Sequence, residues 1–344
     1  MDGIKGPGRA KNLEDAKSFL SDHRLLWLVT GAAGFIGSHL VERLLRLGQR
    51  VVGLDNYATG YRENVDSVTA AVGEKAELFL MREGDITDYD NCLRASSGVD
   101  IVLHMAALGS VPRSMKDPLS THRNNVEGFV NVLMAARENG IKRVVYASSS
   151  SVYGDSPELP KVEERIGRPL SPYALSKRMN EECAELYTRV FGMECIGLRY
   201  FNVFGPRQDP NGAYAAVIPR WFSALAKGER PVIFGDGQTS RDFCYIENVV
   251  AANILAALTE DERAFKEAFN IACGERTTLN ELFRAIRELA PGAGTVEPIY
   301  EDFRPGDIAH SLASIEKAES LLGYEPVVKV REGLKRAARW YLKK

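Results

Sequence analysis

Apolar and polar positions in the N-terminal half of the chain repeat in a strand-then-helix order. Short apolar runs, typical of buried strands, stand at residues 25–29, 50–54, 77–81, 99–104 and 143–147. Longer segments between them carry apolar side chains three or four positions apart, such as Phe129, Val130 and Leu133 within residues 124–139. Continuous apolar strands suit a parallel sheet that is covered on both faces. This order predicts an α/β fold with a doubly wound parallel sheet.

The pattern changes from Asn202 onward, where loops that contain Gly and Pro separate short helical segments. We predict that residues 1–200 form the larger domain, with residues 1–24 as an N-terminal extension. Residues 201–344 are predicted to form a smaller, mixed α/β domain. The apolar segments near 243–272 are expected to return to the first domain.

The first strand and the first long helix are joined by Gly31-Ala-Ala-Gly34-Phe35-Ile36-Gly37. Gly31 can make the tight turn, Gly34 leaves space for a ligand beside the backbone, and Gly37 lets the helix pack closely against the strand. Free N–H groups at the helix N-terminus favour phosphate oxygens. The motif therefore predicts a Rossmann-type site in which these residues bind the pyrophosphate of a dinucleotide.

Asp55 ends the second strand, about 20 residues after the glycine motif, as the dinucleotide fingerprint expects. A carboxylate at this position can accept hydrogen bonds from both adenosine-ribose hydroxyls and would repel a 2′-phosphate. Asn56 begins the polar turn in which the adenosine is expected to lie. The cofactor predicted from these residues is NAD.

Two further strand ends contribute candidate cofactor residues. Asp85, followed by Ile86, is placed either to bond the adenine amino group or to cap a helix. Ala106 and Ala107 are small, which lets the backbone approach the second phosphate and the nicotinamide ribose. In a doubly wound sheet ligands bind beyond the carboxyl ends of the strands, where all these residues fall.

The strongest catalytic signal is Ser171-Pro-Tyr173-Ala-Leu-Ser-Lys177. Ser171 is a favoured N-cap and Pro172 a favoured first helical residue, so a helix is expected to begin here. Tyr173 and Lys177 then lie four residues apart on one face. An ammonium group beside a phenol should lower the phenol pKa below its usual value of about 10, which gives a general base for a sugar hydroxyl.

Together, the glycine motif, Asp55, the serines at 148–151 and the Tyr173–Lys177 pair resemble the extended short-chain dehydrogenase/reductase family. Residues 148–154 (SSSSVYG), 198–205 (LRYFNVFG) and 241–247 (RDFCYIE) resemble its nucleotide-sugar 4-epimerases. Residues 107–114 and 208–219 are similar to a narrower group, the bacterial UDP-N-acetylglucosamine 4-epimerases that supply surface polysaccharide such as O-antigen.

The resemblance implies catalytic roles for Tyr173, Lys177 and Ser149. Tyr173 would be the base, Lys177 its electrostatic partner and the NAD ribose anchor, and Ser149 the hydroxyl that bonds the sugar O4. Ser150 and Ser151 are rivals for this last role. The implied reaction oxidises C4 by hydride transfer to NAD, rotates the 4-keto sugar and returns the hydride to its other face. NAD is regenerated and should stay bound between turnovers.

The resemblance also implies a UDP-sugar site in the second domain. Arg241 and Arg304 would bind the diphosphate, because a guanidinium group matches paired phosphate oxygens. Asn202 would contact the diphosphate or the sugar, Val217 and Ile218 would cover the uracil, and Asp307 would bond the uridine ribose or hold Arg304. In the family a small residue at the position of Ser311 admits an N-acetyl arm. The expected substrates are therefore UDP-GlcNAc and UDP-GalNAc.

Three alternatives stay open. The first is a UDP-glucose or UDP-uronic acid 4-epimerase. The second is a dehydratase, a decarboxylase or a net oxidoreductase; the dehydratases and decarboxylases of the family carry acids where this chain has Ser150 and Ser151. The third is an NAD-binding scaffold without catalysis, although such relatives often lose the tyrosine or the lysine that are both present here.

Composition and charge limit the kinds of partner that the protein is expected to bind. The net charge of −2 gives no reason to expect nucleic acid, and no apolar run is long enough to span a membrane. Residues 1–22 lack the apolar core of a signal peptide, which predicts a cytoplasmic protein. The five cysteines and five histidines show no metal-binding spacing, so no metal site is expected. The family resemblance adds a homodimer, formed by helices near 124–139 and 173–191.

Overall fold

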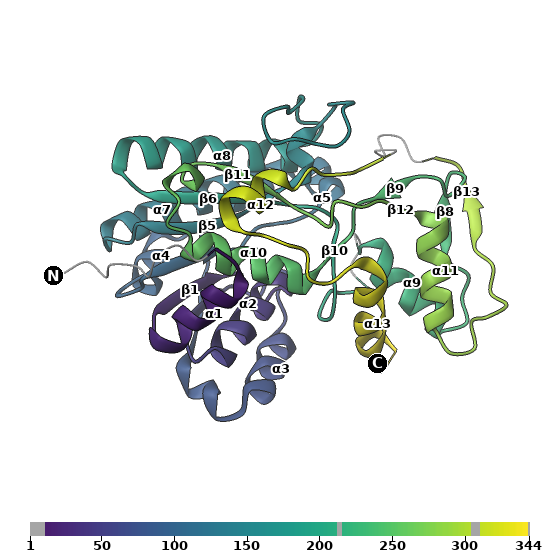
Figure 1. Cartoon of the computed structure of the whole chain (residues 1–344), viewed down its shortest axis with the longest axis horizontal. Helices are drawn as coiled ribbons and strands as arrows, with labels where there is room; N and C mark the ends of the chain where they lie inside the picture. The colour runs from purple at the N-terminus through teal and green to yellow at the C-terminus, as the bar shows by residue number, and fades with distance from the viewer. Residues whose placement is uncertain (1–10, 212–214, 304–309, 343–344) are drawn as a thin grey trace.

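The computed structural model describes residues 11–211, 215–303 and 310–342. Its centre is a seven-stranded, all-parallel sheet in the order β11-β6-β5-β4-β1-β2-β3 (Figure 1). The strands are β1 (Leu26–Thr30), β2 (Arg50–Asp55), β3 (Phe79–Glu83), β4 (Ile101–His104), β5 (Arg143–Ser149), β6 (Glu194–Tyr200) and β11 (Ala268–Ile271). The predicted doubly wound α/β fold is confirmed. Thr30 pairs with both Leu54 and His104, so the carboxyl ends of β1, β2 and β4 meet at one edge.

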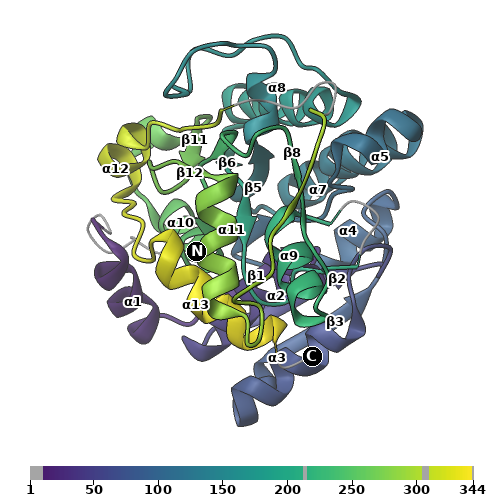
Figure 2. The same cartoon turned by 90° about the vertical axis from the view of Figure 1, so that its right-hand side faces the viewer.

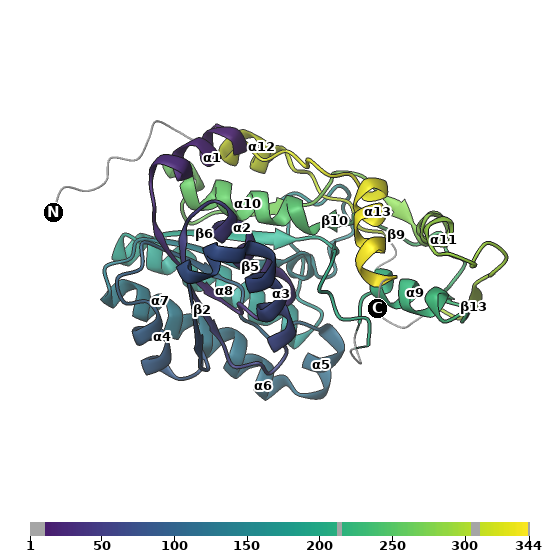
Figure 3. The same cartoon turned by 90° about the horizontal axis from the view of Figure 1, so that it is seen from below.

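Helices cover both faces of this sheet (Figure 3). One face carries α2 (Phe35–Arg46), α3 (Arg62–Val72) and α10 (Ile246–Leu258), with α1 (Leu13–Asp22) and α12 (Glu316–Leu322) outside them. The other face carries α4 (Tyr89–Ala95), α5 (Val111–Lys116), α6 (Pro118–His122), α7 (Gly128–Glu138) and α8 (Pro172–Phe191). α10 is buried along nearly its whole length because α1 and α12 cover its outer side. None of the helices in the described part of the chain is both long and apolar enough to cross a bilayer.

Two predicted segments differ from the structure, one in where it begins and one in its helix type. The strand expected at 77–81 begins at Phe79, because the 3₁₀ helix η1 (Gly73–Leu78) occupies the residues before it. The helix expected at 124–139 starts with the π-helical turn η2 (Arg123–Glu127), which then continues into α7. Single turns of 3₁₀ and π-helix depend on packing that the spacing of apolar residues does not encode.

The smaller part of the molecule lies beyond the sheet edge, at the right of Figure 1 and facing the viewer in Figure 2. Its helices are α9 (Val217–Ala226), α11 (Leu279–Leu289) and α13 (Val330–Tyr341). Its short strands pair as β7 (Val203–Phe204) with β10 (Cys244–Tyr245), β8 (Val232–Phe234) with β13 (Ile299–Glu301), and β9 (Ser240–Arg241) with β12 (Thr277–Thr278). The 3₁₀ turns η3 (Ser150–Tyr153) and η4 (Glu262–Ala264) complete the elements described. β11 lies apart from this region and forms the edge of the main sheet beside β6.

A buried ion pair fastens α8 to the sheet. Arg199 of β6 donates from Nε and Nη2 to the two carboxylate oxygens of Glu181 on α8, at 2.8 and 2.9 Å. Ser148 adds a hydrogen bond to the same carboxylate at 2.6 Å. The side chains of Arg199 and Glu181 are only 4% and 8% exposed. Two charges this deep are tolerated because each is paired and hydrogen-bonded.

We expect Glu181→Gln to destabilise the protein by about 3–5 kcal/mol, because it leaves the Arg199 guanidinium buried without its counter-charge. Glu182→Gln is a matched control on the same helix, where a 56% exposed carboxylate pairs with Arg178. Loss of that exposed pair should cost no more than about 1 kcal/mol. Urea unfolding followed by circular dichroism measures both, and equal midpoints for the two variants would contradict the prediction.

Candidate active site

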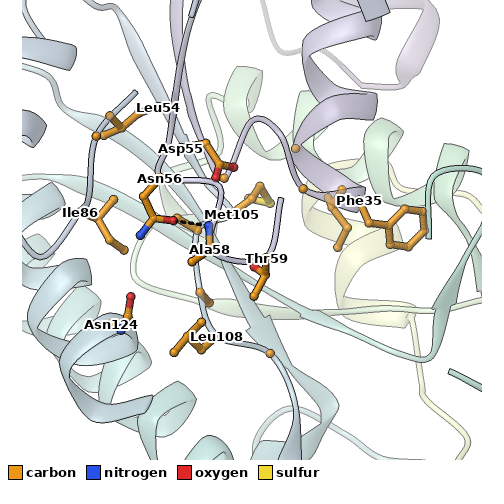
Figure 4. A pocket seen from close by; sticks show the side chains of 18 of the residues that line it. Phe35, Leu54, Asp55, Asn56, Ala58, Thr59, Ile86, Met105, Leu108 and Asn124 are labelled. Atoms are coloured by element: carbon orange, nitrogen blue, oxygen red, sulfur yellow. Dashed lines mark hydrogen bonds between the residues drawn. The ribbon is translucent and has the colours of Figure 1, made fainter. Parts of the chain in front are cut away.

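A cavity of about 410 Å³ opens beyond the carboxyl ends of β1, β2, β3 and β4 (Figure 4). Most of the residues predicted to bind the cofactor meet on its wall: Gly31, Gly34, Phe35, Ile36, Gly37, Asp55, Asn56, Ile86, Ala106 and Ala107. Figure 4 shows side chains from the loops after β1, β2, β3 and β4 around this space. The cavity is large enough for an extended ligand that contacts four strand ends at once.

The conformation of the glycine-rich loop leaves no room for a Cβ atom at two of its glycines. Gly31 has φ +68°, and a Cβ atom there would lie 2.8 Å from the backbone nitrogen of Ala106. A Cβ atom on Gly37 would lie 2.0 Å from the carbonyl oxygen of Gly31. The first turn of α2 therefore packs directly on the loop. The helix begins at Phe35, inside the Gly31–Gly37 motif that was expected to precede it. This backbone cradle fits a dinucleotide pyrophosphate.

Asp55 lies at the end of β2, with its carboxylate turned toward the glycine-rich loop. It accepts hydrogen bonds from the backbone N–H of Ala33 at 2.9 Å and of Tyr57 at 2.8 Å. The residue is 9% exposed. Burial raises the pKa of Asp55, and the two N–H donors oppose this shift.

Asp85 does not cap a helix. The side chain that caps α4 belongs to Asp88, which accepts from the N–H of Asp90, so that alternative for Asp85 is wrong. Asp85 instead accepts from the backbone N–H and the hydroxyl of Thr87, each at 2.8 Å, and from Asn56 Nδ2 at 2.7 Å. Burial raises the pKa of Asp85, but these hydrogen bonds outweigh it and leave the pKa lowered. Asp85 thus fixes the turn that carries Asn56.

The predicted catalytic residues converge at the start of α8 and the end of β5. Ser171 caps α8 by accepting from the N–H of Ala174 at 3.1 Å. Lys177 is 3% exposed, donates to the carbonyl oxygen of Ala147 at 2.7 Å, and lies 6.0 Å from the centre of the Tyr173 ring. Ser149 lies beside the Tyr173 phenol and, taken alone, lowers the pKa of that group.

The serines at 148, 149 and 151 differ in their contacts. Ser148 bonds Glu181, while Ser149 accepts from the backbone N–H of Ser151 at 3.2 Å and reaches Tyr173. The hydroxyl of Ser151 is buried and has no hydrogen-bond partner among the residues that the structure describes. Of the candidates, Ser149 is the one that acts on the pKa of the phenol.

The expected lowering of the Tyr173 pKa is not found. Burial raises the pKa of Tyr173, and the nearby Ser149 opposes this only in part. Burial also lowers the pKa of Lys177 to about 8, against a smaller opposite effect of Glu181. The expectation is wrong because it counted the attraction between the two groups but not the loss of water around both.

A second cavity of about 270 Å³ lies in the smaller part of the molecule. Asn202, Val217, Ile218 and Arg241, all predicted substrate residues, line it. Asn202 adopts φ +34° and donates to the carbonyl oxygen of Asp242 at 3.0 Å.

The remaining predicted substrate residues are placed differently. Arg304 and Asp307 lie outside the described residues. Ser311 donates from its backbone N–H to Ser240 at 3.0 Å, beside the strand that carries Arg241, and is not among the described residues that line either cavity.

The sequence did not single out several residues that complete the two walls. Arg113, Asn124 and Gln208 line the first cavity, and Trp221, Phe234, Thr239 and Leu279 line the second. They come from segments far apart in the chain. Arg113 and Gln208 lie in the segments 107–114 and 208–219 noted above, but the sequence assigned neither of them a role. Only an alignment of strand ends and loops in three dimensions brings them together.

Comparison with known proteins agrees with this geometry. The model of the NAD dependent epimerase/dehydratase family matches residues 27–272. A putative UDP-glucose 4-epimerase from Methanocaldococcus jannaschii is 40% identical over 315 residues, which cover 91% of this chain and 97% of the relative. A UDP-N-acetylglucosamine 4-epimerase from Methanobrevibacter ruminantium, solved with UDP-N-acetylmuramic acid, has a TM-score of 0.86 and 38% identity, covering 93% of this chain and 99% of that one.

A third relative has NAD in its structure. A mutant UDP-glucuronic acid 4-epimerase from Bacillus cereus, in complex with NAD and UDP-4-deoxy-4-fluoro-glucuronic acid, has a TM-score of 0.83 and 29% identity. The match covers 93% of this chain and 99% of that one.

The glycine cradle and the strand-end cavity define a dinucleotide-binding enzyme of the doubly wound class. The chain belongs to the NAD-dependent epimerase/dehydratase family. Within it the three relatives named above are UDP-sugar 4-epimerases, and NAD is the cofactor of the family. The resemblance drawn from the sequence motifs is confirmed at this level.

We expect Gly37→Ala to abolish NAD binding, because the added methyl group would have to displace the carbonyl of Gly31 from under the first turn of α2. Gly294→Ala is the matched control, since a Cβ atom there meets no described atom within 4 Å. NAD bound per protein, measured by chromatography after denaturation, should fall to near zero only in Gly37→Ala. Circular dichroism checks that the variant is folded, and normal NAD content in a folded Gly37→Ala protein would contradict the role of the cradle.

Proposed function

We propose that the protein interconverts UDP-GlcNAc and UDP-GalNAc by inverting C4 of the sugar through a transient 4-keto form. The observation that carries the proposal is the position of Tyr173, Lys177 and Ser149 around the end of β5. In the sheet, β5 lies between β4 and β6. The residues after β4 line the first cavity, and Asn202 after β6 lines the second. A sugar that extends from the second cavity would thus reach this catalytic group beside the cofactor.

The roles follow from the contacts. Tyr173 would accept the proton of the sugar 4-hydroxyl, and the ammonium group of Lys177 would stabilise the phenolate that transfers it. Ser149, which lies beside the phenol, would hold the sugar O4 against Tyr173. NAD, when bound, supplies the group that takes a hydride from C4 and gives it back. Rotation of the keto sugar before the return step makes the reaction an epimerisation.

The absence of an acid beside Ser149 in the sequence favours epimerisation over elimination. Ser150 and Ser151 stand where family dehydratases carry an Asp-Glu pair. Without a second acid–base group at these positions, a 4-keto sugar can mainly be reduced again. The dehydratase alternative and the non-catalytic scaffold are correspondingly less supported.

Substrate choice rests on a narrower argument. Ser311 is small, and its backbone bonds Ser240, whose strand also carries Arg241. We propose that this small side chain admits the N-acetyl arm. A UDP-N-acetylglucosamine 4-epimerase is among the similar structures. The second candidate is a UDP-glucose or UDP-uronic acid 4-epimerase, because other relatives carry those names. Arg241 and Arg304 are proposed to bind the diphosphate, Asp307 the uridine ribose, and Val217 with Ile218 the uracil.

A homodimer formed through α7 and α8 is part of the proposal. Exposed apolar side chains lie along these helices: Met134, Leu175, Leu186, Val190 and Phe191 are each 41–56% exposed. Such a stripe suits burial against the same helices of a second copy. A cytoplasmic location and a role in surface polysaccharide synthesis remain predictions of the sequence.

Incubation of the purified protein with UDP-GlcNAc, without added cofactor, should yield UDP-GalNAc in proton NMR spectra. UDP-glucose should react more slowly, and Tyr173→Phe should reduce the rate of both at least about a hundredfold, as expected for loss of a general base. Ser311→Tyr should slow UDP-GlcNAc more than UDP-glucose. Faster conversion of UDP-glucose or of UDP-glucuronic acid by the natural protein would favour the second candidate, and a 4-keto-6-deoxy product would contradict epimerisation.

The pH profile should show an alkaline limb that belongs to Lys177. Its pKa of about 8 means that the ammonium group is present below that pH and is lost as the pH rises through it. We expect kcat/KM to fall above about pH 8. Glu181 raises the pKa of Lys177, so Glu181→Gln, assayed at a temperature where it stays folded, should move the limb to lower pH. A limb that does not shift would assign it to another group.

A further inference from the structure

Residues 206–209, here called the strap, join β7 to the segment before α9 and lie against the nucleotide-binding part of the chain. Three contacts hold the strap there. The ring nitrogen Nε2 of His39 lies 2.8 Å from the carbonyl oxygen of Pro206, Arg207 forms an ion pair with Glu42, and the Tyr61 hydroxyl donates to Asp209 at 2.7 Å. His39 and Glu42 are on α2, and Tyr61 caps α3.

The strap forms one rim of the cofactor cavity. Gln208 lines the cavity from the strap, and Asn56, Ala58 and Thr59 line it from the turn after β2. Tyr61 directly follows that turn, so its bond to Asp209 ties the two walls together. The turn is itself fixed to the glycine-rich loop, because the backbone N–H of Tyr61 donates to Ala33 at 3.0 Å.

The inner part of the strap is held in a costly conformation. Arg207 adopts φ +65°, and its side chain is only 6% exposed. Its Nε and Nη1 donors are buried without a hydrogen-bond partner in the described part of the chain. Strained backbone and unpaired buried donors persist where the surrounding structure requires the position.

His39 keeps its contact independent of pH in the physiological range. Burial and the nearby Arg207 charge lower the pKa of His39 to about 3, so the ring is neutral. The proton of the neutral ring must then sit on Nε2, because the carbonyl oxygen of Pro206 can only accept.

The strap also touches the wall of the second cavity. Gln208 donates from Nε2 to the carbonyl oxygen of Val203 at 3.1 Å, and Val203 and Phe204 line that cavity. One short segment thus contributes to both ligand sites.

We propose that the strap is the element that retains NAD between turnovers, and that the cofactor leaves when the strap detaches from His39, Glu42 and Tyr61. A redox cycle that returns every hydride needs no exchange of cofactor, and a closed rim prevents its loss. Tyr61, Glu42 and His39 are then positioning residues, which act on NAD through the strap. The inference rests on NAD as the cofactor and does not depend on which UDP-sugar reacts.

The rate of NAD release tests this proposal without a sugar nucleotide. Protein loaded with NAD is diluted into alcohol dehydrogenase and ethanol, which convert each released NAD to fluorescent NADH. We expect Tyr61→Phe and Asp209→Ala each to release NAD about three to ten times faster, the range that loss of one hydrogen bond gives. The double variant should release NAD no faster than the quicker single variant, because both changes remove the same bond.

Tyr89→Phe is the matched control, since Tyr89 is also a surface tyrosine that donates to a carboxylate, Glu138, and its bond joins α4 to α7 away from both cavities. Its release rate should equal that of the natural protein. Release from Tyr61→Phe at the unchanged rate, or additive effects in the double variant, would overturn the proposal. Failure of the proposed epimerase reaction would leave this measurement unaffected, so the two outcomes are separable.

Discussion

The structure depends on one backbone contact, the packing of Gly37 on the carbonyl of Gly31. A Cβ atom at Gly37 would stand 2.0 Å from that oxygen, so no other residue allows α2 to start where it does. The close start aims the free N–H groups of the first turn at the cavity, and it brings Ala33 within reach of Asp55 and Tyr61. The cofactor site, the turn after β2 and the rim that meets the strap are all placed by this contact.

Helix α8, which carries Tyr173 and Lys177, is positioned by a different principle, the compensation of buried charge. Glu181 lies one turn beyond Lys177 on α8 and is neutralised by Arg199 from β6. Burying the pair costs the free energy of desolvating two charges. It nevertheless sets the rotation of α8 against the sheet, because a guanidinium group can donate two hydrogen bonds to a carboxylate in few geometries. Rotation of α8 in turn fixes Tyr173 next to Ser149. The same carboxylate raises the pKa of Lys177 against the larger effect of burial, so one ion pair serves both position and charge.

The parts of the fold that could be predicted from sequence are those written in local patterns. The apolar runs predicted the sheet, and the spacing of Gly31, Gly34 and Gly37 predicted the phosphate-binding loop. Ser171 predicted the start of α8. What could not be predicted depends on contacts between distant segments. Gln208 reaches the cavity only because residues 206–209 fold back on α2 and α3, and the raised pKa of Tyr173 follows from burial that no helix pattern reveals. The boundary of η2 and α7 was missed for the same reason.

The raised pKa of Tyr173 and the closed rim point to the same physical requirement. A phenol that keeps its proton at neutral pH is a poor base until a positive charge comes close, and the nicotinamide of NAD⁺ carries one. Under the proposed function, removal of the cofactor would therefore take away both this positive charge beside the Tyr173 phenol and the hydride acceptor. An enzyme built in this way gains from holding NAD through many turnovers, and the contacts of His39, Glu42 and Tyr61 with residues 206–209 lie where retention can be achieved without blocking the second cavity. Under these proposals, retention of NAD and activation of Tyr173 both depend on residues 206–209, which contact the walls of both cavities.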